Sequence, residues 1–352
     1  MILQASDLSQ PDPKRELYMS RLNMISSQVS SLATQMSSIE ADTFGLDDRL
    51  NRLPSRIGQI RKMNYRALPN IEKDEASLLE RWTSIGPTQK EIVRNTAAML
   101  RPEISSLEGE VSQRRMDTLY DSNRLLGLET RMSTAMIRVS DLGSQVAKSL
   151  GDLKGKIESL EQDLTIAEST VSLTSQASFP WKDGESPILA VEAKDMNKDV
   201  EGVMTLTNLR FIFESEKEVV LKKRLFIATE KKKVRETVLE QPIGTIGNMT
   251  KGRVGLLAGA GLFISFKPET RLQDLKLDVK GHEADWAIRF YNYITSGQAE
   301  AELSAAPGAE AQAVEKPKIT QCPKCGAPFT DEIYRGQTSI RCRYCGAVTP
   351  IS

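Results

Sequence analysis

One long apolar repeat constrains the first half of the chain more than any other feature. Between Leu22 and Ile60, successive seam positions are three or four residues apart, with Thr43 filling one of them. Such steps average 3.5 residues, which keeps one narrow stripe of a helix facing a partner helix. The repeat therefore predicts a coiled coil. Its apolar positions are Leu22, Ile25, Val29, Leu32, Met36, Ile39, Leu46, Leu50, Leu53, Ile57 and Ile60.

A second run of the same kind extends from Ile104 to Val171. Between the two runs, Pro69, the Gly86-Pro87 pair and Pro102 predict a turn region that holds a shorter helix near residues 75–84, because proline lacks a backbone N–H and breaks helices. The pattern fits an antiparallel hairpin of two long helices, and it fits a parallel dimer equally well. The sequence leaves both arrangements open.

Proline also occurs inside the first run, at Pro54. The seam resumes in phase at Ile57, so we expect the helix to continue through this proline with a bend. A seam of this type is ordinarily buried between helices and has no chemistry of its own. We therefore expect residues 1–175 to set distance and oligomeric state, with a second copy or another coiled-coil chain as the partner.

Charge and hydropathy exclude several classes of protein. Lys plus Arg and Asp plus Glu are equal at 47 each, so any attraction to nucleic acid or to an anionic membrane must be local. No apolar run is long enough to cross a bilayer, and residues 1–10 lack a basic segment followed by an apolar one. We expect a cytoplasmic protein that associates with membranes at most peripherally.

The pattern changes abruptly at Phe179. Short β-rich or alternating runs follow, with turn residues between them, and an amphipathic helix closes the region with Trp286, Phe290 and Ile294 at steps of four. The expected strands are 188–193, 203–206, 210–213, 219–221, 237–241, 254–258, 262–266 and 275–279.

This layout of about seven strands and one C-terminal helix is that of the pleckstrin-homology (PH) superfold. Within it, Gly202–Phe213, with the sequence GVMTLTNLRFIF, resembles the signature hairpin of GRAM domains, and many PH domains also carry a tryptophan where Trp286 stands. The resemblance covers residues 176–297. It implies a β-barrel or sandwich with a C-terminal helix that binds lipid headgroups, peptides or proteins, and it implies no catalysis. The fold alone does not select the ligand.

Two basic clusters lie within this PH-like region and form a candidate site for an anionic ligand or lipid. On an anionic membrane each basic residue contributes about 1 kcal/mol of attraction. The alternative is a solvated strand edge, where lysines discourage pairing with other chains. Glutamates among the clusters weaken the positive field. The basic residues are Lys222, Lys223, Arg224, Lys231, Lys232, Lys233 and Arg235.

Four cysteines close the chain as two matching motifs, Cys322-Pro-Lys-Cys325-Gly and Cys342-Arg-Tyr-Cys345-Gly. Each places two sulfurs on one side of a tight bend, and two such bends at this separation predict a zinc ribbon. Four thiolates leave no open position for water, so we expect one structural Zn²⁺, with an iron site as the alternative.

Residues 298–318 are rich in Ala, Glu, Gly and Pro and have no apolar period, which predicts a flexible linker. The ribbon, residues 319–352, should therefore be tethered to the PH-like domain without packing on it. The expected fold is thus multidomain, with an all-α coiled coil, a PH-like domain and a small zinc ribbon.

The sequence contains no recognisable catalytic set, and its one histidine, His282, stands at a predicted helix start. We therefore expect no enzyme. The pattern is typical of a cytosolic adaptor that oligomerises through its coiled coil and docks on a membrane surface or protein partner. The alternative is a nucleic-acid-associated factor that binds through the ribbon, whose basic residues favour that contact.

Overall fold

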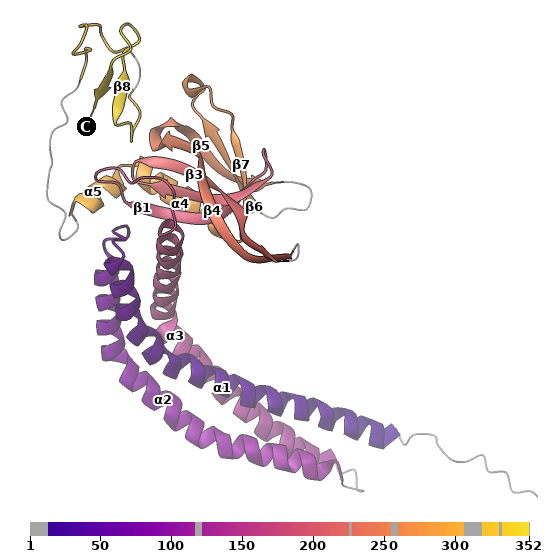
Figure 1. Cartoon of the computed structure of the whole chain (residues 1–352). Coiled ribbons are helices and arrows are strands. Elements are labelled where there is room, and N and C mark those ends of the chain that lie inside the picture. Colours follow the sequence, from indigo (N-terminus) through magenta and orange to yellow (C-terminus); the bar gives the residue numbers. More distant parts are fainter. Residues whose placement is uncertain are drawn as a thin grey trace, which may run out of the picture. The chain divides into compact units, whose positions relative to one another are not determined.

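The computed structural model describes residues 13–116, 122–224, 227–254, 260–305, 319–330 and 333–351. The chain divides into two compact units, which we describe separately. The first comprises Met1–Pro54 and Lys73–Leu160, and the second comprises Ser55–Glu72 and Glu161–Ser352. Figure 1 shows the order of the elements along the chain.

Three long helices make up the helical half of the chain: α1 (Pro13–Lys62), α2 (Ile71–Arg114) and α3 (Ser122–Thr174). In the first unit every pair of these helices is joined by ion pairs, and the order of the partners shows that α1 and α3 run parallel while α2 runs antiparallel to both. The first unit is thus a three-helix bundle. The pairs are Arg21–Glu129, Lys154–Asp42, Lys90–Asp47, Arg101–Glu40 and Arg138–Glu103.

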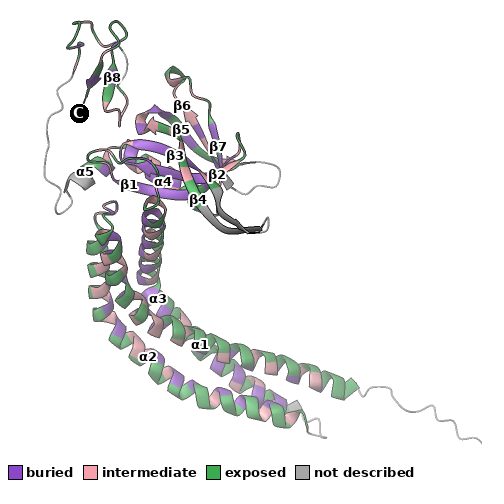
Figure 2. Ribbon diagram, viewed as in Figure 1, coloured by how far each residue is buried: buried purple, intermediate pink, exposed green. Residues whose placement is uncertain are grey.

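The predicted seam is buried within a single chain. All of its apolar members on α1 are buried except Ile39, which is partly exposed, and Thr43 is buried with its hydroxyl donating to the Ile39 carbonyl at 2.8 Å. Figure 2 shows the exposed residues on the outer faces of the helices. The seam is therefore satisfied without a second copy, and association with another chain stays a prediction.

The turn predicted at Pro69 is present, because residues 63–70 connect α1 to α2, but beyond it the expected turn region is one continuous helix, so that part of the prediction was wrong. Helix α2 passes through both Pro87 and Pro102. Its buried side chains, among them Trp82 and Val93, pack in the bundle, and tertiary packing outweighs the local cost of about 3 kcal/mol per interior proline. Gly86 leaves room for the Trp82 ring, because a Cβ at this position would lie 2.8 Å from it.

The second unit is built on a seven-stranded antiparallel sheet of order β4-β3-β2-β1-β7-β6-β5, closed by helix α4 (Glu283–Thr295). This is the PH-like arrangement that the strand pattern predicts. The strands are β1 (Pro187–Asp195), β2 (Val200–Thr207), β3 (Arg210–Arg224), β4 (Ile227–Pro242), β5 (Ile246–Arg253), β6 (Ala260–Phe266) and β7 (Leu275–Val279).

Two strand predictions differ from the structure. The runs 210–213 and 219–221 belong to one long strand, β3, because the glutamate- and lysine-rich residues between them pair with β4. The run 254–258 lies largely outside the described residues, and the strand before it, β5, carries the pairing with β6 instead. Strand β5 is polar on much of its length, so its sequence gave no apolar signal.

Helix α4 buries Ala284, Ala287, Phe290 and Ile294. Phe290 and Ile294 confirm the predicted face, whereas Trp286 is only half-buried and lies at its margin. Side chains from the ends of the long helices also hold the sheet within the second unit.

Two side chains bond to the backbone of β1, Tyr65 from the connection between α1 and α2 and Thr170 from α3. The Tyr65 hydroxyl donates to the Ile188 carbonyl at 3.0 Å, and the Thr170 hydroxyl accepts the Ala190 N–H at 3.1 Å. Both contacts are buried. Burial raises the pKa of Tyr65 well above its ordinary value, so the hydroxyl stays a donor.

The C-terminal part departs from the expected linker. Residues 298–305 form helix α5 (Gln298–Ala305), so a flexible linker cannot begin before residue 306, and residues 306–318 lie outside the described part. The ribbon carries strands β8 (Ser339–Arg341) and β9 (Val348–Pro350). It also packs on the PH-like module, since the Gly244 N–H donates to the Arg335 carbonyl at 3.1 Å. The expectation of a ribbon without contacts is corrected.

Among the described residues, no helix combines the length and the apolar character that crossing a bilayer requires.

We predict that Tyr65→Phe destabilises the second unit by about 1–3 kcal/mol, because it leaves the buried Ile188 carbonyl without a donor. Tyr344→Phe removes the same hydroxyl from an exposed ring and should have an effect near zero. Urea unfolding followed by tryptophan fluorescence measures both. Equal midpoints for the two variants would contradict the prediction.

Candidate functional site

The two cysteine motifs fold into nearly identical turns. In the first, the Cys322 N–H donates to the Ala327 carbonyl at 2.8 Å, and the Gly326 N–H donates to the Cys322 carbonyl at 2.8 Å. Cys342, Ala347 and Gly346 repeat these bonds at 2.8 and 2.9 Å. Gly326 and Gly346 have φ angles of +72° and +71°, which glycine adopts without strain. The glycine after each second cysteine therefore permits the left-handed conformation that each turn requires.

The four sulfurs form one cluster, all within 4.8 Å of one another. Cys322 and Cys345 Sγ are 3.7 Å apart, and Cys325 and Cys342 Sγ are 3.6 Å apart. A disulfide requires about 2.05 Å, so these thiols are not paired covalently. Metal–sulfur bonds of about 2.3 Å in a tetrahedron place neighbouring sulfurs roughly 3.8 Å apart. The predicted ligands therefore form a cage of the right size for a metal ion.

The pKa values of two of these thiols also indicate that the cluster binds a cation. Backbone N–H groups of Cys345 and Tyr344 stabilise the Cys342 thiolate and lower the pKa of Cys342 to about 7. The Ala327 N–H favours the Cys325 thiolate as well, but contacts with the other sulfurs and burial outweigh it and raise the pKa of Cys325 to about 12. The cluster thus cannot hold four thiolates at neutral pH without a positive ion between them.

The two predicted basic clusters lie one on each strand of the β3–β4 hairpin, and each pairs with residues outside the other cluster. Lys222 pairs with Glu230, Lys223 with Ala228 and Arg224 with Ile227, while Val220, Val219 and Glu218 pair with Lys231, Lys232 and Lys233. The side chains of Lys222, Lys223, Arg224, Lys231 and Lys232 lie outside the described part of the structure. The register alone brings the clusters to one end of the hairpin.

Lys233 and Arg235 lie in the described part of the structure, and their side chains differ in exposure and in partners. The Lys233 side chain is 65% exposed and pairs with Glu216, and this contact lowers the pKa of the Glu216 carboxyl. The Arg235 side chain is 7% exposed, and its guanidinium donates to the Leu173 carbonyl at 2.5 Å and lies 3.4 Å from Glu216. Arg235 therefore binds the end of α3, and its position suits a structural contact better than a surface one.

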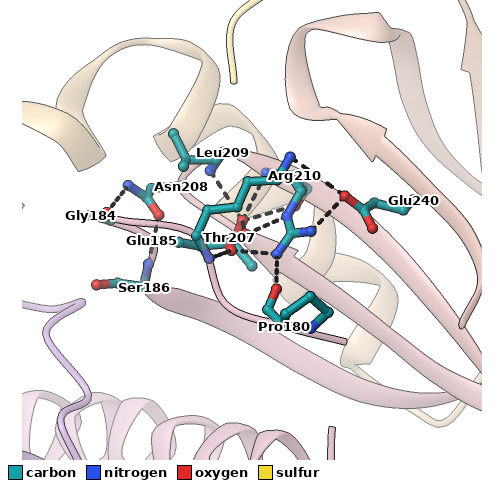
Figure 3. Close-up of polar contacts among 10 residues, drawn as sticks. Pro180, Gly184, Glu185, Ser186, Thr207, Asn208, Leu209, Arg210 and Glu240 are labelled. Carbon is teal, nitrogen blue, oxygen red and sulfur yellow. Dashed lines mark hydrogen bonds and ion pairs between the residues drawn. The ribbon is translucent and has the colours of Figure 1, made fainter. Parts of the chain in front are cut away.

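A buried ion pair, which sequence reasoning missed, holds the turn between β2 and β3 (Figure 3). The Arg210 and Glu185 side chains are 1% and 0% exposed and form an ion pair in which the Arg210 Nε donates to Glu185 at 2.8 Å. The same guanidinium bonds to Glu240 at 2.5 Å and to the Pro180 carbonyl at 2.9 Å. Nothing in the local pattern marks Glu185, because its partner is 25 residues away.

The polar side chains of the turn complete this network. The Thr207 hydroxyl donates to Glu185 at 2.7 Å and accepts the Arg210 N–H at 2.7 Å, and Asn208 bonds to Ser186 and to Gly184. These residues belong to the segment that resembles the GRAM hairpin. In the structure they hold residues 180–186, the strap that precedes β1, against the sheet. Their role is therefore structural.

A pocket of about 920 Å³ with several charged residues in its lining opens between the ends of β1, β2, β7 and the β3–β4 hairpin. Its charged lining is mixed, with more carboxylates than ammonium groups, and the Lys280 ammonium is paired with Glu192 and that of Lys233 with Glu216. This lining does not favour an anionic headgroup. The charged residues are Glu192, Lys194, Glu201, Glu216, Lys233, Asp278 and Lys280.

The one histidine stands at the start of α4, as the sequence predicts. His282 is exposed at the N-cap position, and its side chain makes no capping bond.

No protein-family model and no curated protein matches the chain. Solved structures that match the chain include the linker-DH/PH domains of p115-RhoGEF, at 11% identity over 80% of this chain and 98% of that chain, with a TM-score of 0.23. The DH/PH domains of PDZ-RhoGEF in complex with GTP-γ-S-activated RhoA are 8% identical over 84% of this chain and 98% of that chain, with a TM-score of 0.24. The DH/PH domains of p115-RhoGEF are 13% identical over 83% of this chain and 97% of that chain, with a TM-score of 0.22. At these values the similarity says nothing about activity.

We predict that the purified chain contains one metal ion per molecule and that Cys342→Ser removes it. The ribbon is too short to bury a core, so the metal supplies on the order of 10 kcal/mol of its folding free energy. Elemental analysis measures the metal, and Ser339→Ala, on the neighbouring strand, is the matched control. A wild-type protein that is purified without chelators and contains no metal would disprove the assignment.

A second prediction concerns the buried ion pair. Glu185→Gln leaves the Arg210 charge without its fully buried carboxylate, and it should cost about 3–5 kcal/mol of the second unit's stability. Glu192→Gln removes a carboxylate from the exposed pair with Lys280 and should cost less than about 1 kcal/mol. Denaturant unfolding compares the two, and similar losses would refute the role given to Glu185.

Proposed function

We propose that this chain is a non-enzymatic cytoplasmic adaptor whose PH-like module docks peripherally on an anionic membrane surface through the β3–β4 hairpin. The module would be of the GRAM type, since Gly202–Phe213, the segment with that resemblance, forms the hairpin of β2 and β3. The helical bundle would serve as a spacer and as a contact for another protein or a second copy.

The observation that carries the proposal is the position of the basic clusters. Strand β2 pairs with β3 from Phe211 to Ser215, and beyond Ser215 β3 and β4 pair with each other and with no other strand in the described part of the chain. The two clusters lie on this two-stranded extension, one on each strand and offset along it. A basic projection of this kind can reach a surface without steric conflict from the rest of the sheet.

Charge supports an anionic ligand for this projection. Between residues 218 and 233 there are six basic side chains and only two acidic ones, Glu218 and Glu230. Basic residues at an anionic membrane contribute about 1 kcal/mol each, so the cluster is sufficient for reversible binding. The pocket beside the hairpin is richer in carboxylates, which favours a surface contact over a headgroup held in a cleft.

We further propose that the four-cysteine cage holds a single structural Zn²⁺. Zinc prefers four thiolates in a tetrahedron, and in such a closed site it has no position for substrate or water. The ion would stabilise the ribbon, and no reaction step is assigned to it.

Nucleic-acid binding by the ribbon is the second candidate function. The observation in its favour is Tyr344, which is 72% exposed between Arg343 and the metal ligand Cys345. An exposed ring beside basic groups can stack on an unpaired base.

We predict that the full chain cosediments with vesicles that contain phosphatidylserine and does not cosediment with neutral ones. Changing Lys231, Lys232 and Lys233 together to Gln should weaken binding by up to about 3 kcal/mol, roughly 150-fold. Binding should also fall as salt rises above about 0.15 M, where the Debye length is near 8 Å.

The matched control changes three exposed helical lysines, Lys62, Lys73 and Lys148, to Gln, which alters net charge equally. It should retain vesicle binding. Equal binding of both triple variants, or no preference for anionic vesicles, would exclude the hairpin as the docking element. Binding to single-stranded RNA that Tyr344→Ala abolishes would favour the second candidate.

A further inference from the structure

The ribbon's contacts with the PH-like module gather on the segment between its two cysteine turns. The Gly244 N–H donates to the Arg335 carbonyl at 3.1 Å. Gly336, with φ +80°, lies so close to the β2–β3 turn that a Cβ would overlap the Leu209 carbonyl. A Cβ at Gly244 would lie 2.5 Å from the Arg335 nitrogen. Two glycines, one from each side, thus permit backbone-to-backbone contact.

The side chain of Arg335 reaches the C-terminal end of α4. Its guanidinium donates to the Thr295 carbonyl at 3.3 Å and forms an ion pair with Glu300 of α5 at 3.3 Å. Carbonyls in the last turn of a helix have no partner within the helix, and the negative end of the helix dipole favours a cation there. Arg335 therefore caps α4 from a different part of the chain.

A third contact adds to these two. The Lys267 ammonium lies 4.8 Å from the centroid of the Tyr334 ring, within the range of a cation–π interaction. The segment Tyr334–Gln337 is itself a turn, since the Gln337 N–H donates to the Tyr334 carbonyl at 3.0 Å. All of these contacts come from four consecutive residues, so they form or break together.

We propose that Tyr334–Gln337 is a metal-dependent clamp, and that the partner of the ribbon is the chain's own PH-like module. The inference rests on the proposed metal site. The clamp lies between the ligands Cys325 and Cys342, in a ribbon that has too few residues to fold without its ion. Loss of the metal would release the cap on α4 and uncover Leu209, Gly244 and Thr295. The metal would thus control which surface the module offers to other molecules.

Hydrogen exchange on the full chain tests the clamp, with the last turn of α4 and the amide of residue 244 as readouts. Gly244→Ala blocks the contact from the sheet side and leaves the ribbon unchanged. Gly247→Ala is its matched control, because a Cβ there meets no atom closer than 3.5 Å. Arg335→Ala removes the cap from the ribbon side, and Lys324→Ala is the control on the same ribbon.

Removal of the metal from the wild type should speed exchange at both readouts by about tenfold. Gly244→Ala and Arg335→Ala should do the same in the last turn of α4 while elemental analysis finds the metal retained. Both control variants should match the wild type. Retained metal with fast exchange is the expected signature, because a ribbon that had merely unfolded would lose its ion.

Unchanged exchange in the metal-free protein and in Arg335→Ala would overturn the clamp. If Gly244→Ala does not fold, Arg335→Ala against Lys324→Ala decides the question. A wild-type chain without metal would remove the metal dependence, whereas the two pairs of variants would still report on the contact itself. Failure of the metal site and failure of the clamp are therefore distinguishable.

Discussion

The second unit depends on the burial of one charged side chain, Arg210. Its guanidinium bonds to Glu185, to Glu240 and to the Pro180 carbonyl, and it lies 5.4 Å from the centroid of the Phe179 ring. A buried charge is costly unless each of its donors is satisfied, so these partners must be in place together. The strap before β1, the β2–β3 turn and the edge strand β4 are thereby fixed to one another.

The parts of this fold that sequence could predict are those with a strong period or a fixed spacing. The 3.5-residue seam on α1 and the two cysteine motifs need no knowledge of distant residues, and the structure buries the seam and brings the four cysteines together as predicted. Helix α2 could not be predicted in this way, because the packing of Trp82 and its neighbours outweighs two local prolines. The role of Glu185 could not be predicted for the same reason, because its partner Arg210 lies 25 residues further along the chain.

The glycines of the ribbon also differ in whether the sequence predicts their role. The glycines after Cys325 and Cys345 are readable from the motif, because the turn geometry is local. Gly336 has no such motif, yet it permits the closest approach between the ribbon and the β2–β3 turn. The linker composition predicted a ribbon that is only tethered, whereas the ribbon contacts the PH-like module. The residues that permit this contact are single glycines, Gly244 and Gly336, which no sequence motif marks.

The position of β4 has a consequence for the solubility of the chain. It is an outer strand of sixteen residues that, among the described strands, pairs with β3 alone, and Val234 and Val238 are exposed on it. A long strand with a free edge is a template for intermolecular β-pairing, and flanking charges are what ordinarily prevent it. Lys231, Lys232 and Lys233 lie beside Val234 on this strand. Acetylation of these lysines would therefore remove half of the basic charges of the hairpin and weaken its protection against aggregation in one step.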